Sequence, residues 1–225
     1  VIKENKHDLG LSFEKLWYNE CNWNTANNDD ILFAIPMLKG TTSRYGYNIG
    51  VTIDGGKHAY GSAKNYCQFN ATYLYSFDKD DLRRDITCVP YKYDKDLNQV
   101  IDMGFSANGV GKWSKLKMES PLGASSGSNT GINSVRMRFA DVLLMYAEAV
   151  NERFGPRDDA KEALKRVRRR AFEPSLWANK VESYVESLNS EEQYLIQSIR
   201  IELFWTLLGL TNMALAPVNR KDIQH

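Results

Sequence analysis

The chain has 225 residues, 43% hydrophobic and 25% charged, which is ordinary globular usage and long enough to bury a sizeable core. Its 29 basic and 28 acidic residues leave a net charge of +1, so no overall field favours nucleic acid or an anionic membrane. Three cysteines without a CxxC pair and three scattered histidines match no zinc-site spacing, and we expect neither a metal nor a cofactor. The apolar stretch 203–216 is shorter than the roughly 20 residues that cross a bilayer.

Residues 1–132 are predicted to form an irregular region of short strands and loops. Ser12 can cap a short helix with one apolar face, and the apolar run Ile31–Ile35 predicts a short buried strand. Six glycines and three tyrosines without helical periodicity indicate that 40–61 is a loop. Aromatic residues alternate over 73–77, which favours a strand or an extended edge.

Residues 133–225 are predicted to form a helical core. A Gly/Ser-rich connector at 120–134 leads into a helix expected over 135–154, which is apolar over most of its circumference and therefore packed on several sides. A one-sided amphipathic helix follows from Asp158 or Asp159, and the short link makes the two helices an antiparallel hairpin of the TPR-like kind. A capping box predicts a third helix over 190–209.

Three short motifs resemble catalytic or nucleic-acid-binding sites, but their context favours structural roles. Gly123–Gly127 matches GxSxG, yet no strand is expected before it and no helix directly after it. The glycines before Trp113 do not form a phosphate loop, because Trp113 stands where a Ser or Thr would bind magnesium. The basic run 165–170 shares a helix with an apolar stripe, which indicates a solvated or ion-paired face.

The carboxylates of 78–81 resemble the opening of a calcium loop, but Val89 occupies the position of the bidentate glutamate. We predict instead a turn whose carboxylates pair with Arg83 and Arg84. The spacing of the acidic residues positions no opposed pair of carboxylates, so hydrolase chemistry is not indicated and the chain is not expected to be an enzyme.

The aromatic residues of the loops are the remaining functional signal. Sugar rings have apolar C–H faces that pack on flat aromatic rings while polar neighbours bond the hydroxyl groups. Gly-, Asn- and Ser-rich segments suit such a surface. The alternative is that several of these rings form the core of the irregular region. The candidate ligand-binding residues are Tyr45, Tyr47, Tyr60, Tyr66 and Trp113.

Four blocks in the same order resemble the SusD/RagB family. Asn133–Ala149 is similar, almost continuously, to the family signature vRyADvLLmyAEA, and Leu164–Ala171 looks like the following LNxVRxRA helix, with Lys in place of Asn. Upstream, Asp29–Ile35 resembles the sdEiIFai strand and Asp81–Thr87 resembles DpRRdaT. The chain departs from the family pattern at 205–208.

The resemblance implies a mainly α, SusD-like fold, of which this chain is expected to be the C-terminal fragment. It also implies a lipoprotein on the extracellular face of the outer membrane, held by a lipid anchor that this chain does not contain. Such a protein would bind oligosaccharide without cleaving it and pass it to a SusC-like TonB-dependent transporter. The resemblance further implies structural ion-pair roles for Arg136, Arg138, Glu148, Arg168 and Arg170.

Two alternatives remain open at this point. The helical hairpin could belong to an interaction module that binds a protein or peptide partner through its groove. A glycan-active hydrolase is the other alternative, and it would require two opposed carboxylates.

Overall fold

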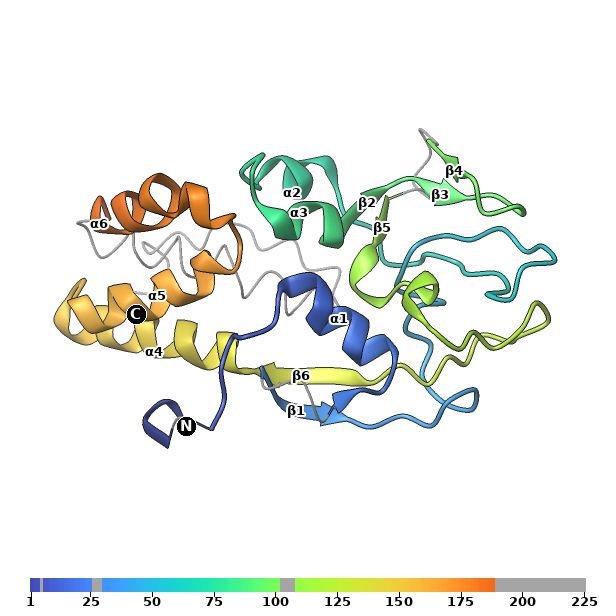
Figure 1. Cartoon of the computed structure of the whole chain (residues 1–225), viewed down its shortest axis with the longest axis horizontal. Coiled ribbons are helices and arrows are strands. Elements are labelled where there is room, and N and C mark those ends of the chain that lie inside the picture. Colours follow the sequence, from blue (N-terminus) through green and yellow to red (C-terminus); the bar gives the residue numbers. More distant parts are fainter. Residues whose placement is uncertain (5, 26–29, 102–107, 189–225) are drawn as a thin grey trace, which may run out of the picture.

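The computed structural model describes residues 1–4, 6–25, 30–101 and 108–188. It places a helical hairpin at one end of the molecule, a set of loops at the other end, and a short helix between them (Figure 1). The α-helices are α1 (Phe13–Cys21), α2 (Ala71–Tyr75), α3 (Leu82–Thr87), α4 (Phe139–Phe154), α5 (Asp158–Arg169) and α6 (Tyr184–Glu186). The strands are β1 (Ile31–Ile35), β2 (Cys88–Pro90), β3 (Lys92–Tyr93), β4 (Gln99–Val100), β5 (Asn108–Val110) and β6 (Ser134–Arg138).

Short helical turns open the chain, follow β5 and connect α5 to α6. A 3-10 turn opens the chain at Ile2–Glu4, and two more follow β5, at Gly111–Trp113 and Lys115–Lys117. A further 3-10 turn at Pro174–Leu176 and a π-helical turn at Ala178–Ser183 connect α5 to α6.

The helical hairpin is confirmed. Gly155, with φ of 78°, ends α4, and α5 begins three residues later, so the two helices run antiparallel. Their facing sides and α6 share one apolar core. The buried members of this core are Phe139, Ala140, Leu143, Leu144, Ala147, Ala160, Ala163, Leu164, Val167, Val185 and Leu188.

The first long helix begins later than the sequence predicts. Residues 134–138 form β6, which pairs antiparallel with β1, and α4 starts only at Phe139. The helical periodicity expected from residue 135 is therefore wrong for four residues, because pairing with β1 holds them extended. This ribbon joins the region before residue 132 to the helical region after it, and the assignment of both regions to one domain stays a prediction.

Asp30 connects β1 to both helices of the hairpin. Its main-chain oxygen accepts from the Phe139 N–H at 2.6 Å, and its Oδ1 accepts from the Ala140 N–H at 3.0 Å. Its Oδ2 accepts from Arg170 Nη1 at 2.8 Å, and both side chains are buried. Asp30 thus acts from a distance as the N-terminal cap of α4 and as the counter-ion of a buried arginine.

The sheets are three separate antiparallel ribbons, β1–β6, β2–β5 and β3–β4. The strand expected at Ile31–Ile35 is confirmed, but its burial is not, since Phe33 and Ile35 are exposed. In the ribbon, Phe33 lies opposite Met137, which is also exposed. One face of this ribbon therefore carries apolar side chains at the molecular surface.

The aromatic segment 73–77 is not a strand. Asn70 caps a short helix, α2, because its Oδ1 accepts from the Tyr73 N–H at 2.8 Å. Tyr73 and Phe77 then lie on one side of the turn with their rings 5.1 Å apart. The alternation of aromatic residues misled the prediction because a spacing of four also fits one helical turn.

A second core lies under α1, whose predicted start is confirmed: Ser12 Oγ accepts from the Lys15 N–H at 3.2 Å. The buried residues of this core come from α1, from β5 and the turn that follows it, and from the connector before β6. They are Phe13, Leu16, Trp17, Cys21, Val110, Trp113, Met118 and Ile132.

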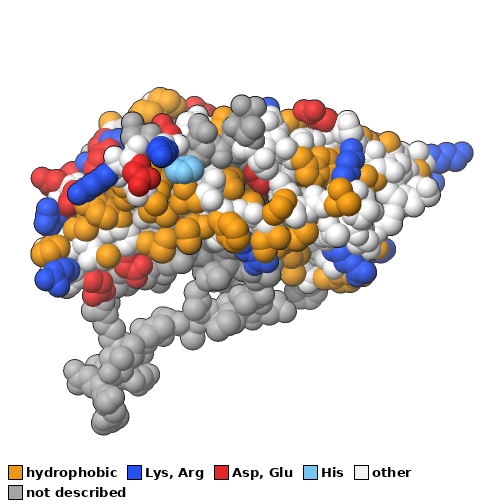
Figure 2. Space-filling view, turned by 90° about the horizontal axis from the view of Figure 1, so that it is seen from below, with side chains coloured by type: hydrophobic (Ala, Val, Ile, Leu, Met, Phe, Trp, Pro, Cys, Tyr) orange, Lys and Arg blue, Asp and Glu red, His pale blue; other side chains and the backbone are white. Residues whose placement is uncertain are grey.

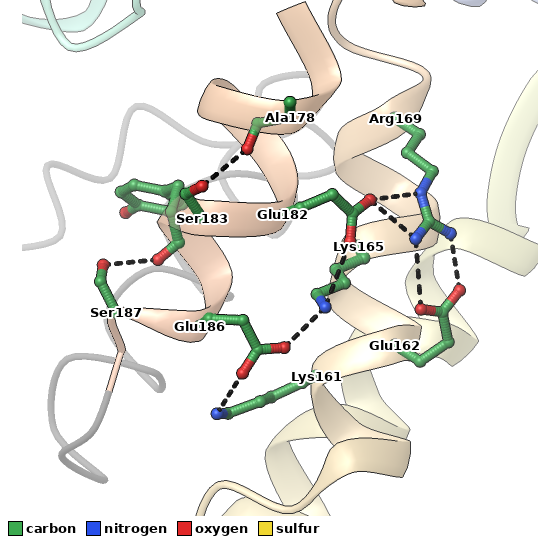
Figure 3. A network of polar contacts seen from close by, with 10 residues as sticks. Lys161, Glu162, Lys165, Arg169, Ala178, Glu182, Ser183, Glu186 and Ser187 are labelled. Atoms are coloured by element: carbon green, nitrogen blue, oxygen red, sulfur yellow. Dashed lines mark hydrogen bonds and ion pairs between the residues drawn. The ribbon is translucent and has the colours of Figure 1, made fainter.

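The basic run of α5 is ion-paired, as expected (Figure 3). Lys165 contacts Glu186 at 2.6 Å and Glu182 at 3.2 Å, and Arg169 contacts Glu162 at 2.6 Å and Glu182 at 2.8 Å. The network fastens the 178–186 segment to α5. The basic side chains of α5 are therefore used in packing within the molecule.

The remaining ion-pair predictions are confirmed only in part. Asp81 pairs with Arg83 at 2.8 Å, but Arg84 pairs with Asp85, and Asp78 pairs with Lys180. Among the residues implied to be scaffolding, Arg138 pairs with Asp141, Arg170 pairs with Asp30, and Arg168 donates to the Lys180 main-chain oxygen. Within the described residues, no ion pair forms at Arg136 or Glu148.

Two sequence-based expectations fall outside the described residues: the third helix at 190–209 and the departure from the family pattern at 205–208. Asp29 also lies outside them. No helix in the described part of the chain has the length and hydropathy that a membrane span needs.

Candidate functional site

Three segments meet at the loop end of the molecule, at the right of Figure 1. The Gly123 N–H donates to the Ala59 main-chain oxygen at 2.8 Å, which joins the Gly/Ser-rich connector to the long loop. Further along, the N–H groups of Thr130 and Gly131 donate to the oxygens of Ser43 and Thr42, both at 2.8 Å. These main-chain bonds hold together a surface that contains little regular secondary structure.

Tyr66 is the most exposed of the five candidate rings, with 68% of its surface accessible. Its N–H donates to the Asn48 main-chain oxygen at 2.8 Å. That bond places Tyr66 next to Asn48, the residue that directly follows Tyr47. The two tyrosines are therefore linked although they are far apart in sequence. Tyr47 itself is half-buried.

Lys115 lies behind these rings and ties two loop segments together. Its Nζ donates to the Ser62 main-chain oxygen at 3.0 Å and lies 5.8 Å from the centre of the Tyr47 ring. The side chain is buried, and burial lowers the pKa of the Lys115 ammonium. Lys115 thus positions Tyr47 relative to the segment that carries Tyr60.

Tyr60 lies two residues before Ser62 and is half-buried. Its ring centre is 6.4 Å from that of His58, and the His58 Nε2 is 3.1 Å from the Asp54 main-chain oxygen. The contacts of Asn48, Lys115 and Ser62 thus join the segments that carry Tyr47, Tyr60 and Tyr66, and we call these three tyrosines the tyrosine layer.

Trp113 does not belong to that surface, which corrects the sequence-based expectation of a loop that presents it. It is only 4% exposed, and its ring lies 5.1 Å from Trp17 and 5.0 Å from Tyr45. The reason is that residues 111–113 form a tight turn directed at α1. A buried indole offers no face to a ligand, so Trp113 is part of the core beneath Tyr45.

Tyr45 is half-buried and belongs to the same support. Its ring packs on Trp113, and its hydroxyl lies 3.2 Å from Ser134 Oγ. Gly46 follows with φ of 79°, and a β-carbon there would lie 2.8 Å from the Trp113 main-chain oxygen. Glycine is required at this position both for its backbone conformation and for the close approach.

Sequence reasoning missed Lys115, Asn48 and Asn65. Asn65 is buried directly before Tyr66, and Asn48 directly follows Tyr47. The signal in the sequence was the pairing of asparagine with tyrosine in both segments. Nothing in the sequence indicated the role of Lys115, because its contacts join segments that are far apart along the chain.

The chemistry of the layer suits binding through ring faces and hydrogen bonds. Residues 120–133 contain neither strand nor helix, so Ser125 does not lie on a strand–turn–helix elbow. Among the described residues, no group of three or more His, Cys, Asp or Glu side chains is arranged to hold a metal ion.

The model of the SusD family matches residues 13–209. The resemblance noted from the four sequence blocks is thereby confirmed. No curated protein sequence matches the chain.

Solved structures share the fold. A SusD homologue from Bacteroides thetaiotaomicron VPI-5482 is 25% identical with a TM-score of 0.73, and the match covers 92% of this chain and 44% of that one. A surface glycan-binding protein A from Bacteroides thetaiotaomicron, solved in complex with laminarihexaose, is 15% identical with a TM-score of 0.58 over 92% and 47%. A surface glycan-binding protein A from Bacteroides uniformis is 19% identical with a TM-score of 0.55, and the match covers 95% of this chain and 44% of that one. This chain therefore spans less than half the length of these relatives, and its mainly α, SusD-like fold is confirmed.

Proposed function

The chain belongs to the SusD family, and from this premise we propose that it binds glycan at the cell surface through its tyrosine layer. The layer holds the ligand by stacking sugar rings on Tyr47, Tyr60 and Tyr66 while neighbouring polar groups bond the hydroxyls. The chain is not an enzyme in this proposal: it binds the oligosaccharide and leaves its glycosidic bonds intact.

The observation that carries the proposal is that contacts between separate segments link three tyrosines, of which Tyr66 is exposed and Tyr47 and Tyr60 are half-buried. The Asn48–Tyr66 main-chain bond and the Lys115 contacts hold these segments together, at 2.8 Å and 3.0 Å respectively. A surface whose aromatic rings are positioned before binding loses less entropy when a ligand orders it. Rings packed only for stability would instead be turned into the core, as Trp113 is.

Membership of the SusD family supports a cellular location and a partner for this glycan binding. We propose that the protein acts on the extracellular face of the outer membrane as the nutrient-binding component of a SusCD-type uptake system. Its partner there is a SusC-like TonB-dependent transporter, which receives the oligosaccharide. We propose that attachment to the membrane is through an N-terminal lipid anchor.

The test is a glycan-array screen followed by calorimetric titration of the strongest ligand, with laminarihexaose included because a protein of the same fold was solved with it. Tyr66→Ala should weaken binding about tenfold, which is about 1.4 kcal/mol. Tyr75→Ala is the matched control, since Tyr75 is 81% exposed but lies on α2 outside the layer. Equal affinities for the two variants would remove Tyr66 from the site.

A further inference from the structure

The loop end of the molecule carries an excess of basic residues. The segments 36–67 and 108–133, which meet there, contain seven lysines and arginines but only two carboxylates, whereas the whole chain has 29 basic and 28 acidic residues. Two of the seven, Lys112 and Lys115, are buried, and the other five are exposed or half-buried. Figure 2 shows Lys and Arg side chains at this end, on the right, whereas most of the Asp and Glu side chains visible in that view lie over the helical end.

The two carboxylates of these segments are already engaged. Asp54 Oδ2 lies 3.5 Å from Lys92 Nζ of β3, and Glu119 accepts a hydrogen bond from the Tyr18 hydroxyl. The neighbouring β3–β4 hairpin contains two lysines and two aspartates within 92–98, so it leaves the excess unchanged. The cations of α5 differ, because Lys165 and Arg169 lie 2.6–3.2 Å from glutamates (Figure 3). The positive charge of the loop end is therefore not used for packing in the same way.

Each tyrosine of the tyrosine layer has an exposed basic residue two or three positions before it in the sequence. Among the described residues, none of these three basic side chains forms an ion pair. We call them the layer cations. The pairs of cation and tyrosine are Arg44 with Tyr47, Lys57 with Tyr60, and Lys64 with Tyr66.

A turn brings the first pair together. The Tyr47 N–H donates to the Arg44 main-chain oxygen at 3.1 Å, so the two residues lie at the ends of one turn. The buried Lys115 ammonium adds a further positive charge, 5.8 Å from the centre of the Tyr47 ring. Its hydrogen-bond partner is the neutral main-chain oxygen of Ser62, which leaves this charge unneutralised.

The third pair shares one side of its segment. Exposure alternates along 63–66, where Ala63 and Asn65 are buried and Lys64 and Tyr66 are exposed. An alternation with a period of two means that residues two apart project to the same side of an extended chain. The Lys64 ammonium therefore lies on the solvent side together with the most exposed ring of the layer.

We propose that the tyrosine layer binds an acidic glycan, in which sugar rings carry carboxylate or sulfate groups. This inference rests on the proposed function and specifies its class of substrate. The sugar rings stack on the tyrosines while their anionic groups pair with Arg44, Lys57 and Lys64. Complementary charge of this kind favours the acidic ligand over a neutral one and speeds its association. A neutral glycan would gain nothing from the layer cations.

Calorimetric titration of acidic glycans beside their neutralised forms tests the proposal. One pair of ligands is oligogalacturonate and its methyl ester, and the other is a sulfated galactan oligosaccharide and its desulfated form, so the two arms separate carboxylate from sulfate. At about 0.02 M salt, where charges are weakly screened, we expect at least one acidic ligand to bind about tenfold or more tighter than its neutral form and than laminarihexaose. This preference should shrink several-fold at about 0.5 M salt.

A charge-removing variant gives a second reading. Arg44→Gln/Lys64→Gln should weaken binding of the preferred acidic glycan about tenfold at low salt and should make its affinity less dependent on salt. Lys79→Gln is the matched control, since Lys79 is exposed but lies between α2 and α3, away from the layer. Equal affinities and equal salt dependence of the two variants would overturn the role of the layer cations.

The outcomes separate this inference from glycan binding itself. Neutral forms that bind as tightly as the acidic ones, or an acidic preference that salt does not change, would overturn the acidic-glycan proposal and leave glycan binding by the tyrosine layer standing. If no glycan binds, acidic or neutral, the proposed function fails and the inference fails with it.

Discussion

At the scale of single residues, Trp113 separates two roles that the sequence alone does not distinguish. An aromatic residue beside two glycines can be a ligand platform or a core residue. The buried ring, which lies edge-on to Trp17 and tilted against Tyr45, assigns Trp113 to the core. The ligand platform is then left to tyrosines whose rings reach solvent.

Trp113→Ala should therefore destabilise the fold by about 3–5 kcal/mol, the usual loss when a large buried aromatic residue is truncated. Chemical denaturation measures this change. Trp113→Phe should lose much less, since it keeps an aromatic ring in the same core. A Trp113→Ala protein as stable as the parent would contradict the burial of the indole.

Gly46→Ala tests how closely the backbone beside Tyr47 approaches the core residue Trp113. The φ of 79° is unfavourable for alanine, and the new β-carbon would lie 2.8 Å from the Trp113 oxygen. We expect a loss of about 1–3 kcal/mol in the free energy of unfolding. Gly127→Ala is the control, because a β-carbon there has no neighbour within 4 Å. Equal stabilities of the two variants would refute the close approach.

At the scale of secondary-structure elements, Asp30 holds β1, α4 and α5 together. Asp30→Ala removes the side-chain bond to the Ala140 N–H at the start of α4 and leaves Arg170 buried without its counter-ion. The expected loss is about 3–5 kcal/mol, as for other broken buried ion pairs. Asp29 immediately precedes Asp30 in the same motif, but only Asp30 has described contacts. Thermal unfolding that is unchanged by Asp30→Ala would contradict this role.

The network that fastens α6 to α5 should depend on pH. Hydrogen bonds from Lys165 and Lys161 lower the pKa of the Glu186 carboxyl from 4.5 to about 2. A lowered carboxyl pKa stabilises the fold above about pH 4.5, and this stabilisation disappears as the pH falls through 2.

Glu186→Gln should therefore destabilise the protein at pH 7 by less than about 1 kcal/mol, because Glu186 is largely exposed. The difference from the parent should shrink as the pH falls below 4.5, which denaturation at a series of pH values would show. Glu173→Gln, at an exposed glutamate for which the described residues provide no ion pair, is the control. A difference that stays constant down to pH 2 would contradict the assignment.

The elements also show why prediction succeeded in some places and failed in others. The two long helices and the cap at Ser12 follow from local patterns, and the sequence predicts them correctly. Residues 135–138 and 73–77 were assigned wrongly, because pairing with β1 extends the first segment and the Asn70 cap coils the second. Only tertiary contacts decide such ambiguous segments.

At the scale of the whole molecule, the chain has a helical end and a loop end, and each has a distinct task in this account. The family assignment follows from blocks in the helices and short strands. The proposed site lies in loops, where the sequence predicts which residue types matter but not which rings face solvent. That distinction depends on long-range contacts such as those of Lys115 with Ser62 and Tyr47.

The most direct test of the central claim is calorimetric titration of the best glycan from the array screen into two variants. One is Tyr60→Ala/Tyr66→Ala, which alters the tyrosine layer, and the other is Trp113→Phe, which alters only the core beneath it. We predict that the double variant loses most of its affinity, by more than about tenfold, and that Trp113→Phe binds as the parent does. Full affinity in the double variant, with binding lost in Trp113→Phe, would contradict the account.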